Sequence, residues 1–201
     1  MTIPPPEGFA EALSQSDFIS NLLKATESPN NEVLAAHLPA EVLDRLKKGE
    51  RLEFNFYTKV SVLKMAKARD VTDEEFAGLI TYFESQSPSV LDIKGPVMKA
   101  AVQRLQRGLN STSGREVPLE LGQPQTLGSF EKTKDVYSLM LVIPLKLPTG
   151  ETPLLCGLSM VKVSRRVLFV NTYRKFTSEE DAAALRDFTR KWVGEILAAN
   201  R

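Results

Sequence analysis

The chain has 201 residues, of which 42% are hydrophobic and 25% charged, a composition typical of a globular protein and not of a disordered one. Its net charge of +1 divides into about −4 for residues 1–100 and +5 for residues 101–201, which lacks the clustered basic footprint of nucleic-acid-binding proteins. One cysteine, Cys156, and one histidine, His37, exclude an internal disulfide and the usual zinc or iron sites. We therefore expect no nucleic-acid partner, no metal and no cofactor.

The longest apolar run, "SLMLVIPLKL" at residues 138–147, is too short to cross a membrane. It has half of the roughly 20 residues that a spanning helix requires, and it contains Pro144 and Lys146. The N-terminal stretch "MTIPPPEGFAEAL" lacks the basic start and apolar core of a signal peptide. We expect no membrane span and a cytoplasmic location, or a periplasmic one if a signal peptide has been removed.

Four elements are predicted before residue 63. Helical spacing of apolar residues between Phe9 and Leu23 indicates one helix or two short ones after a stiff, proline-rich lead-in. Residues 31–38 have the pattern of a strand, and residues 39–49 that of a short helix with a proline at its start and a glycine past its end. Alternation over residues 52–62 predicts a strand with one packed face and one wet or lightly covered face.

Two amphipathic helices are predicted next, at residues 71–83 and 96–109. The polar stretch "NSTSGRE" at residues 110–116 has the composition of a loop. We expect a single domain over residues 1–201, with two packed halves, 1–109 and 117–201, as the alternative that this loop leaves open.

The pattern then changes to strands, at residues 127–131, 136–147, 154–163 and 167–173. The second and third are joined through "PTGET" and the last two by a tight turn at Arg165–Arg166, which predicts an antiparallel meander. Because the last strand is apolar on both sides, we expect it to be central and covered on each face.

The consecutive acids Glu179, Glu180 and Asp181, a few residues after the basic pair Arg174 and Lys175, could suggest a catalytic or metal-binding cluster. Thr177 and Glu180 have the spacing of a capping box, and acids in a first turn are stabilised by the helix dipole. We interpret the cluster as the start of a C-terminal helix and not as a metal or acid–base site. Thr72 and Glu75 have the same capping-box spacing earlier in the chain. We attribute this match to coincidence in preference to a duplication of half of the chain.

Signals for catalysis are weak. A Cys156–His37 nucleophile pair would need an orienting third group, and Cys156 falls within an apolar strand, where a free cysteine usually packs as a small hydrophobe. No phosphate loop or dinucleotide fingerprint is present. Scattered carboxylates could still meet in the fold, so a hydrolase is the alternative to a non-catalytic protein. We expect no catalytic residue.

Four basic residues lie on or beside the last hairpin: Arg165, Arg166, Arg174 and Lys175. A solvated face is the favoured interpretation. The alternative is a docking patch on one rim of the sheet for a partner protein with an acidic surface.

The C-terminal region, with "LGSFEKTKDVYSLMLV", a hairpin, "VLFVNTY" and an acid-capped helix containing Trp192, resembles uncharacterised bacterial proteins and, more loosely, the PsbP-like superfamily. The resemblance covers about 75 residues and carries over no functional residue. It implies an α/β sandwich and a binding, adaptor or assembly role. We therefore predict an α+β fold, a predominantly antiparallel sheet packed with helices, in a non-catalytic protein-interaction, adaptor or assembly protein of bacterial origin. Its oligomeric state is left open.

Overall fold

The computed structural model describes residues 1–50, 55–147 and 150–201 and confirms the predicted α+β class. Seven strands form one antiparallel sheet in the order β1-β2-β3-β10-β9-β6-β5. Their bounds are β1 Phe9–Glu11, β2 Asn31–Pro39, β3 Phe56–Leu63, β5 Gln125–Lys132, β6 Val136–Ile143, β9 Leu154–Val163 and β10 Arg166–Lys175. The predicted meander is confirmed, since β5, β6, β9 and β10 are neighbours in that order.

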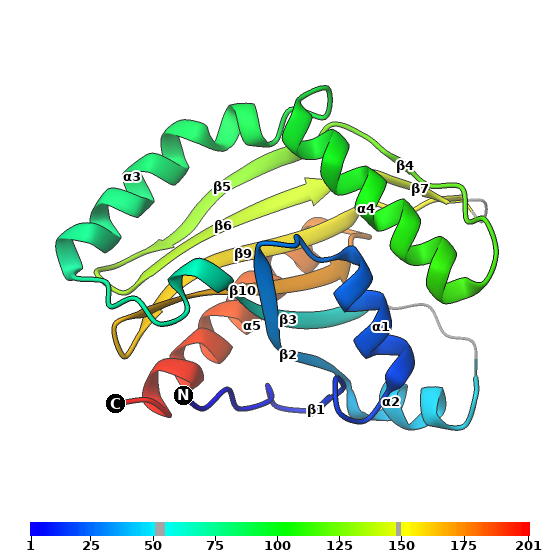
Figure 1. Cartoon of the computed structure of the whole chain (residues 1–201), viewed down its shortest axis with the longest axis horizontal. Helices are drawn as coiled ribbons and strands as arrows, with labels where there is room; N and C mark the ends of the chain where they lie inside the picture. The colour runs from blue at the N-terminus through cyan, green and yellow to red at the C-terminus, as the bar shows by residue number, and fades with distance from the viewer. Residues whose placement is uncertain (51–54, 148–149) are drawn as a thin grey trace.

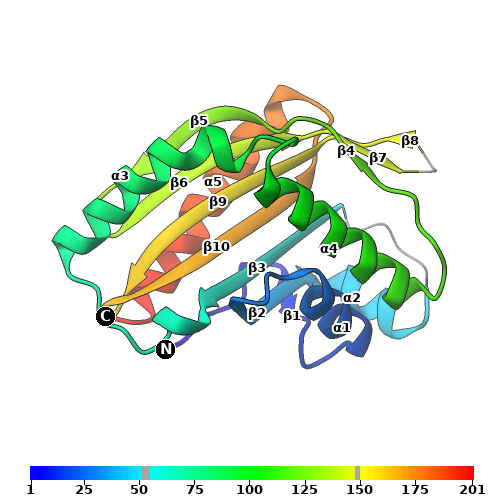
Figure 2. The ribbon, with the colours of Figure 1, turned by 45° about the horizontal axis from the view of Figure 1, so that its top comes forward.

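A second, small sheet of three strands continues from one end of the first: β4 Glu120–Leu121, β7 Leu145–Leu147 and β8 Gly150–Glu151. The helices are α1 Asp17–Thr26, α2 Ala40–Lys47, α3 Asp73–Val90, α4 Pro96–Ser113 and α5 Glu179–Ala198, with a 3₁₀ turn, η1, at Lys64–Ala66. Helix α5 lies behind the main sheet, and the other long helices lie on its opposite side (Figures 1 and 2).

Helix α5 covers one face of the sheet. Its Trp192, Val193 and Ile196 are at most 1% exposed and pack on Leu168 and Val170 of β10. The predicted C-terminal helix therefore supplies the centre of the largest core, including Trp192.

The opposite face is covered in two separate places. Helices α1 and α2 pack on the β1–β2 side through a core that includes Leu23, Leu38 and Leu43, while α3 packs over β6 and β9 through Phe76 and Ile80. Strand β10 is the middle strand, as predicted. Helices lie over both of its faces, as expected, but Phe169 and Asn171 remain partly exposed between the two groups of helices.

Three other expectations need correction. Phe9 to Glu11 form a strand paired with β2, and the first helix starts only after Ser16, whose side chain accepts from the Ile19 amide. Helix α4 runs on through Ser113, so residues 110–113 are not loop, and Gly114 ends the helix in the left-handed conformation. For the face of β3 predicted to be wet or lightly covered, the first alternative is wrong: Ser61 is 2% exposed, and the Lys59 side chain is paired.

The predicted helix starts differ in their outcome. Helix α3 begins at Asp73 with the predicted capping box of Thr72 and Glu75. Helix α5 is capped one residue later than predicted, with Ser178 at the N-cap, and the carboxylate of Asp181 accepts hydrogen bonds from the amides of Thr177 and Ser178. Residues 52–54 of the strand predicted at residues 52–62 and residues 148–149 of the predicted "PTGET" turn lie outside the described residues.

Candidate functional site

The four basic residues that the alternative interpretation placed on one rim of the sheet do not come together. Arg165 belongs to the two-residue turn between β9 and β10, in which it and Ser164 have positive φ, and Arg166 begins β10. Arg174 and Lys175 end the same strand, ~30 Å away at 3.3 Å per residue. The docking role of these residues stays a prediction, but they do not form one surface.

Acidic neighbours also reduce the charge of this set. Arg165 lies 3.3 Å from a carboxylate oxygen of Asp70, with which Arg166 also pairs. Arg174 lies 2.8 Å from Asp181. Three of the four basic residues are therefore held by acids of the same chain.

The sheet separates the lone histidine from the lone cysteine. His37 lies on the α5 face, where its ring packs edge-on against Trp192 at a centroid distance of 5.4 Å. Cys156 lies on the opposite face in the core beneath α3, is 1% exposed, and burial raises the pKa of its thiol to about 12. The two side chains cannot form a nucleophile–base pair in this fold.

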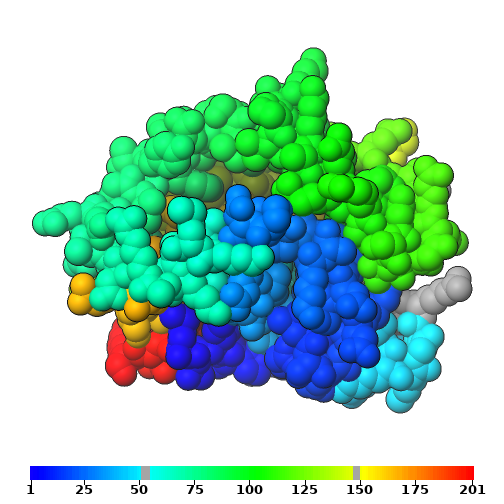
Figure 3. Space-filling view, in the orientation of Figure 1, coloured from blue at the N-terminus to red at the C-terminus, as the bar shows by residue number. Residues whose placement is uncertain are grey.

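The gap between α1 and α3 leaves a cleft over the middle of the sheet, with a volume of about 190 Å³. Its floor crosses β3, β10, β9 and β6, and its walls come from the end of α1, the start of β2 and α3. Figure 3 shows this hollow, with strands visible in its depth between α3, α4 and the β2 side. We call this hollow the cleft. It is lined by residues that include Glu27, Asn31, Ser61, Phe83, Tyr137, Leu158, Met160, Phe169 and Asn171.

An ion pair forms the polar end of the cleft. Glu27, at the C-cap of α1, pairs with Lys59 of β3, and these side chains are only 11% and 14% exposed. Asn31 donates to the other carboxylate oxygen of Glu27 at 2.9 Å. Burial raises the pKa of Glu27, but Lys59 and the hydrogen bonds outweigh that effect and hold the pKa below its usual value. This carboxylate is therefore ionised and fixed in place.

Two polar side chains on the floor of the cleft have no hydrogen-bond partner among the described residues. Asn171 of β10 and Ser61 of β3 make no side-chain hydrogen bond with any other residue that the structure describes. Polar groups removed from water are normally paired. Beside them lie the half-buried apolar side chains of Leu158, Phe169 and Phe83, so the cleft combines an apolar floor with unpaired polar atoms.

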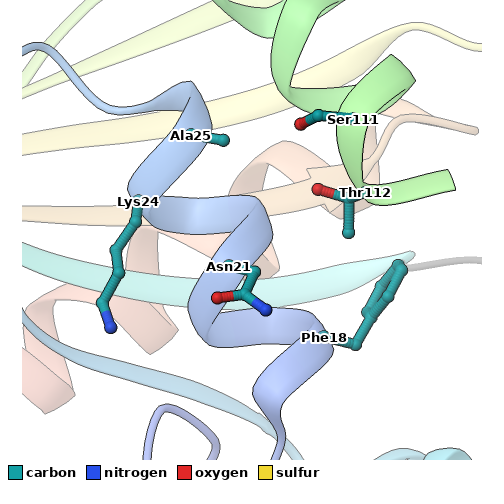
Figure 4. Close-up of a pocket in the computed structure, with 6 residues that line it drawn as sticks. All are labelled: Phe18, Asn21, Lys24, Ala25, Ser111 and Thr112. Atoms are coloured by element: carbon teal, nitrogen blue, oxygen red, sulfur yellow. The ribbon is translucent and has the colours of Figure 1, made fainter. Parts of the chain in front are cut away.

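A second hollow lies between α1 and α4, lined by Phe18, Asn21, Lys24, Ala25, Ser111 and Thr112 (Figure 4). The two helices pack closely near its end: a Cβ atom added to Gly108 of α4 would lie 2.5 Å from Thr26 Cγ2 of α1. Lys24 extends away from α4 and is the one charged side chain in the lining. This hollow is open to solvent, and its lining residues do not form a cluster of charged or catalytic side chains.

The cleft was missed by sequence reasoning because its residues come from seven elements spread along the chain. One signal was present in "VLFVNTY", where Asn171 follows an apolar run in a central strand. An amide on such a strand indicates either a buried hydrogen-bond network or a binding surface.

Two wider searches of the described ranges gave negative results. No group of three or more His, Cys, Asp or Glu side chains there could hold a metal ion. Likewise, no helix within those ranges has the length and apolar character that a bilayer-crossing segment needs.

Comparison with known proteins gives limited information. No protein-family model and no curated protein sequence matches the chain. Among solved structures it is similar to a mutant of the protein Mog1, at 9% identity and a TM-score of 0.39 over 97% of this chain and 86% of the other. It is also similar to the Saccharomyces cerevisiae Ran-binding protein Mog1p, at 9% identity and a TM-score of 0.36 over 97% and 85%. Similarity at these values does not assign the chain to a family.

Proposed function

We propose that the protein is a non-catalytic binding protein whose cleft receives a segment of a partner protein. The observation that carries the proposal is the floor of the cleft, where central strands present half-buried apolar side chains next to the unpaired polar groups of Asn171 and Ser61. A partner that covered this floor would bury apolar area and supply the missing hydrogen bonds. Such a cleft suits the adaptor or assembly role predicted from the sequence.

The size of the cleft favours side chains over a whole small molecule. Its volume of about 190 Å³ is below the roughly 300–1,000 Å³ of typical small-molecule sites. One or two side chains of a peptide segment fit such a volume, with the rest of the segment crossing the surface between α1 and α3.

The chemistry of the cleft favours binding over hydrolysis. A general acid would need a carboxyl group with a raised pKa, whereas the carboxylate in the cleft, Glu27, has a lowered one. The carboxyl whose pKa is raised by burial, Glu131, lies on β5, where the charge of Arg190 partly opposes the shift. The scattered-carboxylate alternative therefore receives no support from this site.

The proposal can be tested with a displayed library of random peptides, selected on the intact protein and measured by calorimetry. Selected peptides should share an apolar or aromatic anchor residue, and Phe169→Ala and Asn171→Ala should each weaken binding by about tenfold. The matched control is Leu127→Ala, an exposed apolar residue on edge strand β5 (41% exposed), which should have no effect. Folded cleft variants that bind as tightly as the wild type would overturn the proposal.

A further inference from the structure

Charges are segregated along the chain across α3 and α4. Residues 70–92 contain no lysine or arginine and six acids: Asp70, Asp73, Glu74, Glu75, Glu84 and Asp92. Residues 93–115 contain no acid and five bases: Lys94, Lys99, Arg104, Arg107 and Arg115. The two helices that frame the cleft-bearing face in Figure 3 therefore carry opposite formal charges.

Ion pairs neutralise most of the acidic segment. Lys162 pairs with Asp73, and the Lys162 side chain is only 7% exposed. Arg69 pairs with Glu75 at 2.8 Å, and Lys132 with Glu84 at 2.8 Å. Asp70 is held by the two arginines of the β9–β10 hairpin. Little negative charge on α3 is left to offset α4.

The basic segment is not neutralised. None of its five bases forms an ion pair with any residue in the described part of the chain. Four of them are exposed, and the fifth, Arg104, buries its Nε without a hydrogen-bond partner among the described residues. An uncompensated cation beside a surface attracts anionic groups over about a Debye length, roughly 8 Å at physiological salt.

Helix α4 is also lightly attached. It packs on the remainder of the protein chiefly through α1, and Gly108 is its one buried residue in the described part of the chain. Its apolar residues Met98, Val102, Leu105 and Leu109 are only half-buried and belong to none of the buried core clusters. Apolar area is therefore still available along the helix beside its positive charge.

We infer that α4 and the cleft together bind an acidic amphipathic segment of a partner protein, an inference that rests on the proposed function. Apolar side chains of the segment would enter the cleft, and its carboxylates would meet the unpaired bases of α4. A lipid surface fits less well, because the surface is concave and Val97 is the one large apolar side chain on α4 with at least 36% exposure among the described residues. Insertion into a bilayer needs a broad apolar helix face.

The test compares two double variants of equal charge change. Lys99→Glu with Arg107→Glu reverses the exposed face of α4, and Lys48→Glu with Lys134→Glu reverses two exposed bases elsewhere. The probes are a synthetic helical peptide with leucines on one face and glutamates on the other, the same peptide with lysines in place of the glutamates, vesicles of phosphatidylcholine with phosphatidylserine, and single-stranded DNA.

We expect the intact protein to bind the glutamate peptide in preference to the lysine peptide, the vesicles and the DNA. The α4 reversal should weaken that binding by about tenfold or more and remove most of its salt dependence, while the control reversal should leave both unchanged. Equal binding by the α4 variant, or stronger binding to vesicles or DNA, would overturn this inference. If Phe169→Ala weakens binding of library-selected peptides but the α4 reversal does not, the inference is wrong and the proposed function stands. If Phe169→Ala has no effect, the proposed function is wrong and this inference falls with it.

Discussion

His37 should lower the stability of the protein as the pH falls from 6.5 toward 4. The side chain is 1% exposed and lies between β2 and α5, with Nδ1 3.0 Å from Thr58 Oγ1. Its Nε2 is buried without a hydrogen-bond partner among the described residues. A positive charge at this position would be desolvated and poorly paired.

The magnitude follows from the difference between the native and unfolded pKa values of His37. Burial lowers the native pKa from 6.5 to about 4, against a smaller opposing effect of Glu11. Because the unfolded chain binds the proton more tightly, stability is intact above the unfolded pKa and is lost as the pH falls from 6.5 toward 4. At 1.36 kcal/mol per pKa unit, the loss reaches about 2.5 kcal/mol near pH 4.5.

Urea denaturation followed by the fluorescence of Trp192, the lone tryptophan, measures this effect at a series of pH values between about 7 and 4.5. His37→Asn serves as the comparison. Its stability at neutral pH should differ from that of the wild type, and its stability should change less as the pH falls, because the contribution of His37 is absent. The carboxyl of Asp181, whose pKa is lowered to about 2, loses its contribution only below this window. Equal pH slopes for the wild type and His37→Asn would refute the reasoning.

Three further predictions concern packing, capping and reactivity. Gly157→Ala should lower the free energy of unfolding by about 1–3 kcal/mol, because its Cβ would lie 2.5 Å from Thr172 Oγ1. Gly194→Ala in α5, where a Cβ meets nothing within 4 Å, should instead raise it by up to about 1 kcal/mol, as urea curves would show. Asp181→Asn should lower the thermal midpoint more than Glu179→Gln does, because Asp181 caps α5; equal shifts would contradict that capping role. Cys156 should react with a thiol reagent only as fast as the protein unfolds, since burial raises its pKa to about 12; rapid labelling of the native protein would show that it is accessible.

Local patterns predicted most of the fold because each element buries a face that its own sequence encodes. The apolar runs of β9 and β10 and the apolar residues from Leu185 to Ile196 all correspond to buried or half-buried positions in the structure. The start of α5 was misplaced by one residue because Thr177 and Ser178 are both good capping residues, and each is followed three residues later by an acid. In the structure Ser178 is the N-cap, and the carboxylate of Asp181 accepts from the amides of Thr177 and Ser178.

The site could not be predicted in the same way, because it depends on where two groups of helices leave the sheet uncovered. Nothing local to β10 indicates that α1 and α3 stop short of Phe169 and Asn171. The basic residues singled out from the sequence lie at opposite ends of one strand, since residues close in a sequence separate quickly along an extended chain. The unpaired charge of α4 was visible in the sequence, but its significance depends on the ion pairs that neutralise α3.

The central claim is that a partner segment binds in the cleft between α1 and α3. Amide chemical-shift mapping tests it most directly, with isotope-labelled protein titrated with a peptide selected from the displayed library. We predict that the largest shifts occur at Leu158, Phe169 and Asn171 and at neighbouring residues of α1 and α3, with little change on the outer surface of α5. Shifts confined to α5 or to edge strand β5, with the floor of the cleft unchanged, would contradict the claim.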